Sequence, residues 1–283
     1  MWGKDFEGWY FKHQRDGDAI AFIPGRAKSG AFIQMIGCRG SRQFDVAELT
    51  IRENVIHAGG CCFSARGVAV DLPGVRGELR YGPLSPLRGD IMGPFRFLPM
   101  QCRHGVISMG HALSGSLEVD GRVISFDGGQ GYMEKDSGTS FPRSYLWLQC
   151  NDFPRQCSLM LSIAHIPFAG LSFLGCICAI LFEGREYRLA TYRGVRILSA
   201  GPGRVCLAQG GLRLTVDVLS PGGGHSLRSP VKGVMSGLIR ESNHAAIGVR
   251  LQNGGRTVFD LCSEHASFEW VGGGEPNGSS SAR

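Results

Sequence analysis

The stretch Gly131 to Phe153 reads GYMEKDSGTSFPRSYLWLQCNDF and lies near the middle of the 283-residue chain. At its start, Tyr132, Glu134 and Asp136 stand at alternate positions. Side chains at alternate positions of an extended strand point to the same face of a sheet. A turn rich in Gly, Ser and Pro follows, and then an aromatic segment. The stretch therefore predicts a strand with an acidic face, a turn and a second strand.

Short apolar runs separated by turn residues continue in both directions from this stretch. The chain contains 43 glycines, and 43% of its residues are hydrophobic. Glycine between short apolar runs is typical of tight turns that join strands. Long segments with the apolar spacing of a helix are hard to find, and only residues 188–192 and a few turns could be helical. We therefore predict an all-β chain.

Segments of the second half repeat segments of the first half in the same order. Trp147–Cys150 aligns with Trp9–Lys12, and Ala266–Trp270 aligns with Gly131–Lys135. Ordered matches at a nearly constant spacing predict an internal duplication. In this prediction each half supplies the strands of one antiparallel sheet.

An antiparallel sheet of roughly eight to ten strands can close into a barrel, which removes its free edges and can enclose an apolar ligand. We predict two tandem antiparallel lipocalin-like (calycin) β-barrels, at residues 1–136 and 144–271, joined by a linker at 137–143. The Gly- and Ser-rich tail, residues 272–283, is expected to be disordered.

The distribution of charge argues against nucleic acid as a partner. Lys and Arg number 30 against 24 Asp and Glu, which gives a net charge of +6 without a dense basic run. Nucleic-acid-binding proteins concentrate basic residues on one face or helix. The first residues show no apolar signal segment, and the apolar run Leu171–Phe182 is too short to span a bilayer. We expect a cytoplasmic protein.

The ten cysteines have spacings that do not predict a metal or disulfide framework. Cys61 and Cys62 are adjacent, Cys176 and Cys178 are separated by one residue, and no C-x-x-C pair occurs. A structural zinc site usually needs two such pairs. We expect reduced thiols that pack as small core residues, and no metal or cofactor.

Two motifs resemble the tocopherol cyclase family. They are Phe6–Lys12, which reads FEGWYFK, and Gly131–Asp136, which reads GYMEKD. The resemblance implies a pair of lipocalin-like domains with a site at their junction. It also implies a relation to the carotenoid hydratases, whose Gly-Tyr-His-Asp-His motif places its tyrosine on Tyr132 and its acidic residue on Glu134. The compact chain, in which no plastid transit peptide is evident, looks like a bacterial member.

The resemblance implies acid-catalysed cyclisation of a prenylated hydroquinone or a similar isoprenoid. That reaction needs a protonated acid in a dry pocket, because a trisubstituted alkene must receive a proton. We predict Glu134 as the proton donor, Tyr132 as its hydrogen-bond partner, and Asp136 as a modulator or cation stabiliser. The residues alone also allow a structural alternative, in which Glu134 and Asp136 form ordinary hydrogen bonds at the mouth of the barrel or pair with Lys135 and Arg143.

Five further side chains are candidates for substrate binding. Trp9, Tyr10 and Trp147 could line a pocket for a prenyl chain, although large aromatic residues in a barrel are more often core. His104 and His111 flank a predicted strand and could orient a phenol hydroxyl. The alternative is that both histidines are structural, since their spacing fits no zinc pattern.

A second class of function remains open from the sequence. The chain could be a non-catalytic carrier or sensor of a hydrophobic ligand, and Ser137 stands where the family commonly has a tryptophan. A barrel of this type hosts both enzymes and carriers. Under either hypothesis the partner is a hydrophobic small molecule, and transient contact with a membrane surface is expected.

Overall fold

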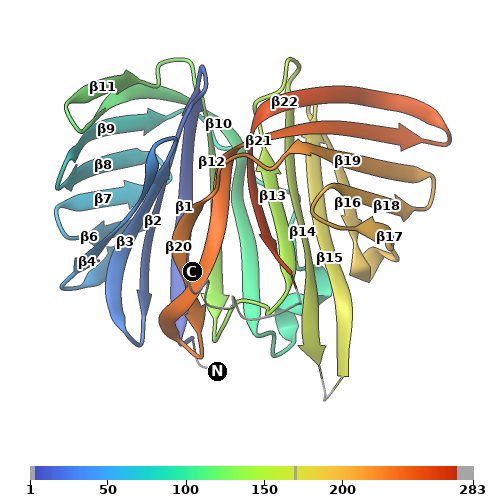
Figure 1. The fold of residues 1–283 in the computed structure, drawn as a ribbon, viewed down its shortest axis with the longest axis horizontal. Coiled ribbons are helices and arrows are strands. Elements are labelled where there is room, and N and C mark those ends of the chain that lie inside the picture. The colour runs from blue at the N-terminus through green and yellow to red at the C-terminus, as the bar shows by residue number, and fades with distance from the viewer. Residues whose placement is uncertain (1–3, 169–170, 273–283) are drawn as a thin grey trace, which may run out of the picture.

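The computed structural model describes residues 4–168 and 171–272, and within them the prediction of an all-β chain is confirmed (Figure 1). Two short 3-10 helices, η1 (Gly93–Phe97) and η2 (Thr191–Arg193), interrupt the strands, and no α-helix occurs in the described ranges. None of their helices is long and apolar enough to cross a membrane. The predicted disordered tail lies outside the described residues, apart from residue 272.

The first half of the chain forms one antiparallel sheet. Its strands are β1 (Phe6–Arg15), β2 (Asp18–Ala27), β3 (Gly30–Gly37), β4 (Gly40–Val46), β5 (Leu49–Arg52), β6 (Val55–Ala58), β7 (Cys61–Ser64), β8 (Gly67–Leu72), β9 (Val75–Tyr81), β10 (Cys102–Val119), β11 (Arg122–Ser125) and β12 (Gln130–Gly138). They pair in the order β4-β3-β2-β1-β12-β10-β9-β8-β7-β6-β5, and β11 pairs with β10. The first strand of the half thus lies beside its last.

The second half forms a second antiparallel sheet with a corresponding path. Its strands are β13 (Tyr145–Cys150), β14 (Cys157–Phe168), β15 (Leu171–Phe182), β16 (Arg185–Ala190), β17 (Arg196–Ala200), β18 (Arg204–Gln209), β19 (Leu212–Ser220), β20 (His225–Val231), β21 (Val234–Asn253) and β22 (Arg256–Val271). They pair in the order β16-β15-β14-β13-β22-β21-β19-β18-β17, and β20 pairs with β21. The first and last strands again lie together, as an internal duplication predicts.

The strand pairing shifts the predicted alignment of the two halves by one residue. Tyr10 on β1 faces Glu134 on β12, and Trp147 on β13 faces Glu269 on β22. Because Glu269 corresponds to Glu134, the partner of Trp147 in the first half is Tyr10 and not Trp9. A slip of one residue exchanges the two faces of a strand. Accordingly, Tyr10 and Trp147 pack in one cluster, whereas Trp9 packs in the core of the first sheet.

Each sheet curls around its own hydrophobic core. Phe11, Phe22 and Phe63, from three strands, meet in the first core, and Leu148 and Leu161 belong to the second. The predicted closure into barrels is not seen in the hydrogen bonds. Within the described residues the first path ends at β4 and β5 and the second at β16 and β17, and no ladder joins either pair of ends.

The two sheets lie side by side (Figure 1), and a third apolar cluster joins the two halves. It combines Tyr10, Met109 and Tyr132 with Tyr145 and Trp147 from the second half. Strand β20, which pairs with β21, also contacts β3 and β4 of the first sheet. The two sheets are therefore packed together near β12 and β13, the strands of the stretch Gly131 to Phe153.

Polar contacts also cross this junction. The Lys12 ammonium is fully buried and donates to Gln149 Oε1 at 3.0 Å, and burial lowers its pKa to about 8. Asn151 Nδ2 donates to the carbonyl of Gly131 at 2.9 Å, and Ser158 donates to the carbonyl of Met109. A buried polar group is costly unless it is paired, so these bonds fix how the sheets meet.

Candidate active site

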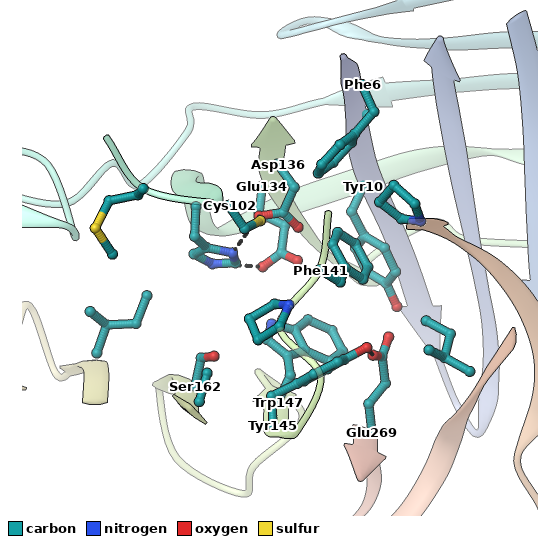
Figure 2. A pocket seen from close by; sticks show the side chains of 18 of the residues that line it. Phe6, Tyr10, Cys102, Glu134, Asp136, Phe141, Tyr145, Trp147, Ser162 and Glu269 are labelled. Atoms are coloured by element: carbon teal, nitrogen blue, oxygen red, sulfur yellow. Dashed lines mark hydrogen bonds and ion pairs between the residues drawn. The ribbon is translucent and has the colours of Figure 1, made fainter. Parts of the chain in front are cut away.

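A cavity of about 170 Å³ lies between the two sheets (Figure 2). Most of the side chains that line it are apolar, among them Phe6, Phe32, Phe95, Phe141, Ile177 and Ile239. Six polar or ionisable side chains also reach it, namely Tyr10, His104, Glu134, Asp136, Glu241 and Glu269. An apolar cavity with a few convergent polar groups is the usual form of a small-molecule site.

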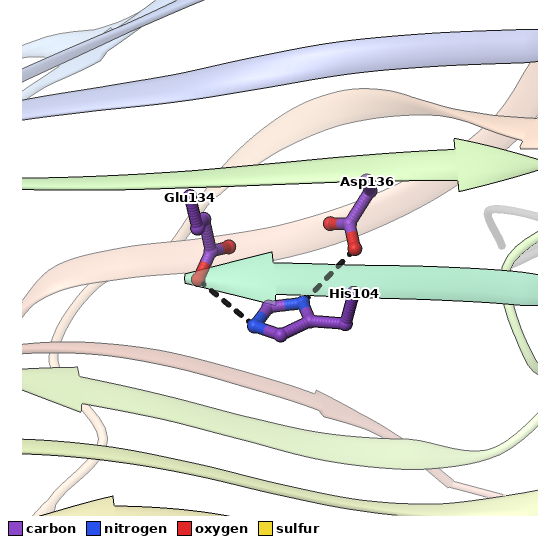
Figure 3. A group of neighbouring side chains, drawn as sticks. All are labelled: His104, Glu134 and Asp136. Carbon is purple, nitrogen blue, oxygen red and sulfur yellow. Dashed lines mark hydrogen bonds and ion pairs between the residues drawn. The ribbon is translucent and has the colours of Figure 1, made fainter. Parts of the chain in front are cut away.

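One group of ionisable side chains comes from the neighbouring strands β10 and β12 (Figure 3). His104 lies directly across the ladder from Asp136, and Glu134 is two residues away on the same face of β12. The His104 Nδ1 atom is 2.9 Å from Asp136 Oδ1, and its Nε2 atom is 3.3 Å from Glu134 Oε2. The imidazole therefore bridges the two carboxylates. We refer to these three residues as the histidine bridge.

The charge of the histidine bridge follows from its surroundings. Burial by itself would lower the pKa of His104, but the charges of Glu134 and Asp136 and their hydrogen bonds raise that pKa well above its ordinary value. His104 is thus an imidazolium between two acidic side chains. Tyr132 donates its hydroxyl to Glu134 Oε2 at 2.6 Å, and the same oxygen forms the ion pair with His104 Nε2. Burial, followed by the charge of Glu134, raises the pKa of Tyr132, which stays a neutral donor.

The histidine bridge is also the place where a cation could bind. Its ligand atoms lie within 4.8 Å of one another. Imidazole and carboxylate ligands suit several divalent metals. Both imidazole nitrogens face a carboxylate, however, and in the imidazolium neither nitrogen has a lone pair to offer a metal ion.

A second acidic group lies on another wall of the cavity. Glu241 on β21 stands directly across the ladder from Glu269 on β22. Tyr10 donates its hydroxyl to Glu241, and Tyr145 donates to Glu269 at 2.6 Å. Figure 2 shows Glu269 apart from Glu134 and Asp136. Burial raises the pKa of both glutamates, and for Glu269 the charge of Glu241 raises it further.

Comparison with known proteins identifies the family. The profile of the "Tocopherol cyclase-like" family matches residues 79–273. The chain belongs to the tocopherol cyclase-like family. The chloroplastic tocopherol cyclase of Zea mays is 27% identical over 192 residues, and a probable chloroplastic tocopherol cyclase of Oryza sativa subsp. japonica has the same identity and length of match. These matches cover 60% of this chain and 39% or 40% of those relatives, so the chain matches less than half of their length.

Solved structures show the same fold at much lower sequence identity. Kievitone hydratase from Nectria haematococca has a TM-score of 0.56 at 9% identity, covering 95% of this chain and 90% of that one. A putative AttH from Nitrosomonas europaea has a TM-score of 0.55 at 12% identity, covering 93% and 92%. CghA with Sch210972 has a TM-score of 0.59 at 12% identity, covering 94% and 88%. The tocopherol cyclase-like chain thus shares its two-sheet fold with these proteins over nearly its whole length.

The tocopherol cyclase-like chain brings most of its sequence-predicted site residues together. Glu134, Asp136, His104, Tyr10 and Trp147 all line the cavity. Tyr132 is fully buried behind the wall and reaches the site through its bond to Glu134.

The contacts do not show the pairing with Lys135 that the structural alternative for the two acidic residues includes, whereas its other form, ordinary hydrogen bonds, stays open. Lys135 binds Glu7 at 2.8 Å, and its ammonium lies 4.1 Å from the centre of the Trp9 ring. It points to the face of β12 opposite Glu134, as alternation along a strand requires.

Two predicted residues lie away from the cavity lining. Trp9 belongs to the core of the first sheet. His111 is buried, with Nδ1 at 3.1 Å from Ser108 Oγ and its ring centre 4.4 Å from that of Tyr81. Burial lowers the pKa of His111 to about 4, so the imidazole is neutral. Its surroundings are those of a core histidine.

The sequence-based reasoning missed Glu241 and Glu269 as site residues. For Glu269 a signal was present, because the repeated segment Ala266–Trp270 aligns it with Glu134. Glu241 has no such signal, since the residue that faces Glu134 at the matching place on β10 is Val106. Only the pairing of β21 with β22 brings the second glutamate to the site.

Proposed function

We propose that this protein catalyses the acid-driven cyclisation of a prenylated hydroquinone or a similar isoprenoid. The observation that carries the proposal is the position of Glu134, which borders an apolar cavity while Tyr132 and His104 both contact its carboxyl group. The histidine bridge holds a proton among three groups next to surface that suits a hydrocarbon chain. A proton source beside a dry, apolar pocket is what protonation of an alkene requires.

In the proposed reaction, the His104 imidazolium gives its proton to the Glu134 carboxylate, which passes it to the alkene. A new C–H bond forms at the less substituted alkene carbon, and the positive charge appears on the tertiary carbon. The Asp136 carboxylate and the faces of Tyr10 and Trp147 border the cavity and would stabilise that cation. Attack by the substrate hydroxyl oxygen then closes the ring.

The relatives support this class of reaction. Two of them are named as tocopherol cyclases, and a protein of the same fold is named as a hydratase. Protonation of an alkene opens both cyclisation and hydration, and the two differ in whether a substrate hydroxyl or water attacks the cation. The cavity therefore needs to exclude water for cyclisation to dominate.

The first test compares wild-type protein with the Glu134→Gln variant on hydroquinones that carry geranyl or phytyl chains. Glutamine keeps the hydrogen bond from Tyr132 but cannot release a proton. We expect the variant to form cyclised product about 10²- to 10⁴-fold more slowly, the usual contribution of a general acid. Chromatography with mass spectrometry measures the product, and equal rates in the two proteins would remove Glu134 from the mechanism.

Mass spectrometry of lipids extracted from the natively purified protein separates the enzyme from a carrier. A prenylated quinol enriched in Glu134→Gln, with its cyclised isomer in the wild type, supports the enzyme. The same unaltered lipid in both samples supports a carrier instead.

An apolar substrate of this kind partitions into membranes, so we also propose transient contact with a membrane surface. Phe97 and Leu238 are 73% and 75% exposed, and they adjoin segments that supply the cavity-lining Phe95 and Ile239. Co-sedimentation with vesicles of phosphatidylcholine and phosphatidylglycerol tests this contact. Recovery of all the protein in the supernatant would contradict it.

A further inference from the structure

The proposed cyclisation has two proton transfers, and the histidine bridge accounts for one of them. The alkene gains a proton when the cation forms, and the attacking hydroxyl must lose one when the ring closes. A base that accepts this second proton has to lie where the oxygen lies, which is away from the alkene carbon that was protonated. Among the described residues that line the cavity, the other carboxyl groups are those of Glu241 and Glu269.

The geometry of these two glutamates makes them a proton-holding pair. They occupy directly opposed positions on β21 and β22 and are 1% and 8% exposed. Side chains at directly opposed positions of a ladder lie on the same face and are close neighbours, so the two carboxyl groups lie side by side. Two like charges in directly opposed positions of a sheet destabilise it, and burial adds to this cost. One proton shared between the two carboxyl groups removes the conflict.

The groups around the pair leave it able to take a second proton. Tyr10 and Tyr145 each donate a hydroxyl to one glutamate, and burial raises the pKa of both phenols, so neither surrenders its proton readily. Two further charges act on the pKa of Glu241. The buried ammonium of Lys12 lowers it, and the carboxylate of Glu134 raises it. A singly protonated pair therefore keeps one carboxylate that can act as a base.

A free donor beside the pair supplies an anchor for the substrate oxygen. Trp147 lines the cavity and is 6% exposed, and its indole nitrogen has no hydrogen-bond partner within the described part of the chain. Trp147 also lies directly across the ladder from Glu269. An unpaired buried N–H group is costly, and a ligand oxygen would satisfy it.

We infer that the Glu241–Glu269 pair is a second catalytic group, which accepts the proton of the substrate hydroxyl while Trp147 holds that oxygen. This inference rests on the proposed function. The C–O bond forms as the O–H bond breaks, and the proton goes to the carboxylate of the pair. The product is an isomer of the substrate, with no atoms gained or lost. The pair ends with one proton more and the histidine bridge with one fewer, and exchange with water restores both.

The repeat supports a role for the pair beyond maintaining the fold. In the first half, the residue that faces Glu134 across the β10–β12 ladder is the apolar Val106. The second half has Glu241 at the place that faces Glu269. The same strand pairing is thus built without a second acid, so the fold itself does not require one at this position.

Deuterium exchange separates the two proton transfers. Wild type, Glu134→Gln, Glu241→Gln and Glu269→Gln are each incubated in D₂O with geranyl hydroquinone. If the pair is the base, the Glu241→Gln and Glu269→Gln variants still protonate the alkene, but the cation mostly loses a proton and returns to an alkene. We expect deuterium in the recovered substrate and cyclisation slowed by about 10²-fold or more. Glu134→Gln should show neither exchange nor product.

Glu7→Gln is the matched control. Glu7 is also a buried glutamate, at 6% exposure, but its carboxyl binds Arg26 and Lys135 outside the cavity lining. Thermal melting verifies that each variant is folded. We expect Glu241→Gln and Glu269→Gln to remain folded, because glutamine still accepts a bond from tyrosine and removes one acid from the pair.

The outcomes distinguish this inference from the proposed function. Wild-type rates of cyclisation in Glu241→Gln and Glu269→Gln would overturn the inference and leave the function of Glu134 intact. Loss of both exchange and cyclisation in these folded variants would also overturn it, since the pair would then serve an earlier step. If the wild type itself neither exchanges nor cyclises the probe, the proposed function fails and the inference fails with it.

Infrared spectroscopy tests the shared proton without a substrate. A protonated carboxyl group has a C=O stretching band that a carboxylate lacks. We expect this band in wild type and in Glu134→Gln at pH 6, and its loss when Glu241 and Glu269 are both replaced by glutamine. A band of unchanged size in the double variant would contradict the shared proton.

Discussion

His104 carries its positive charge between two acidic side chains, and this placement makes it the residue on which the site most depends. Its nitrogens are 2.9 Å from Asp136 and 3.3 Å from Glu134. Removal of the imidazolium would leave two buried carboxylates close together without a counter-charge. Loss of one partner from such a group is more costly than the pair itself is stabilising.

We predict that His104→Gln destabilises the protein in a pH-dependent way. The pKa of His104 is raised in the folded state above its unfolded value of about 6.5. Its stabilisation is therefore complete below about pH 6.5 and is lost as the pH rises through the raised pKa. We expect a loss of about 1.5–3 kcal/mol at pH 6, the size of hydrogen bonds to charged groups, and a smaller loss at pH 9. Urea unfolding at both pH values measures it, and an equal loss at each would contradict the charge.

The same sign applies to Glu241, because its pKa is also raised in the folded state. Burial raises its pKa to about 7, against about 4.3 for an unperturbed glutamate. Between these values the folded state holds a proton that the unfolded chain has released, so stability falls as the pH rises from about 4 to about 7. Glu241→Gln should flatten that part of the pH profile of melting temperature. A profile that keeps the wild-type slope would show that Glu241 is ionised throughout.

The residues of the histidine bridge could be found from the sequence to different degrees. Glu134 and Asp136 were predictable because alternation along one strand is a local property. His104 was named only as a candidate, because its contact with Asp136 depends on the register of β10 against β12, which includes bulges. The Glu241–Glu269 pair depends on the register of two other strands, and no local pattern encodes it.

At the scale of the element, Gly131 near the start of strand β12 contacts both β10 and the second half of the chain. A Cβ atom at Gly131 would lie 2.3 Å from His111 Nε2, and the imidazole ring packs against Tyr81 and bonds to Ser108. The carbonyl of Gly131 accepts a hydrogen bond from Asn151 of the second half. Glycine at this position therefore lets β12 approach β10 closely. Its carbonyl also binds the loop that follows β13.

We predict that Gly131→Ala destabilises the protein by about 1–3 kcal/mol, the usual cost of overpacking a core. The neighbouring strand provides a control, because a Cβ atom at Gly105 meets nothing closer than 3.7 Å. Gly105→Ala should leave the melting temperature nearly unchanged. The double variant Gly131→Ala/His111→Ala should melt above Gly131→Ala/His111→Phe, since a smaller side chain makes room. Equal melting of Gly131→Ala and wild type would contradict the crowding.

The elements themselves were predictable in kind but not in extent. Short apolar runs and glycine turns predicted strands, and strands were found. His104 and His111, which were expected to flank a strand, both lie within one long strand, β10. Its bulges break the alternation that a sequence pattern can detect. The one-residue slip in the alignment of Trp147 has a different origin. Identity of residue type favoured Trp9 over the structurally matched Tyr10.

At the scale of the whole molecule, the two halves share an apolar cluster in addition to their separate cores. The cluster that contains Tyr10, Tyr132 and Trp147 has members from both sheets, and the cavity is walled by both. The predicted limits at 136 and 144 remain predictions of domain organisation, and strand β12 ends at Gly138 while β13 begins at Tyr145. Separation of the halves would expose apolar surface together with buried groups such as Lys12 and Gln149.

We predict that the protein unfolds as one cooperative unit. Each half alone would lose the shared cluster and leave the Lys12 ammonium without its partner Gln149, which adds a cost of desolvation to the loss of apolar burial. Calorimetry should therefore show a single transition whose calorimetric and van't Hoff enthalpies agree. Gly131→Ala, although it lies in the first half, should lower that whole transition. Two resolved transitions, of which only the first moves in Gly131→Ala, would show instead that the sheets are independent domains and that the cavity between them can open without unfolding either one.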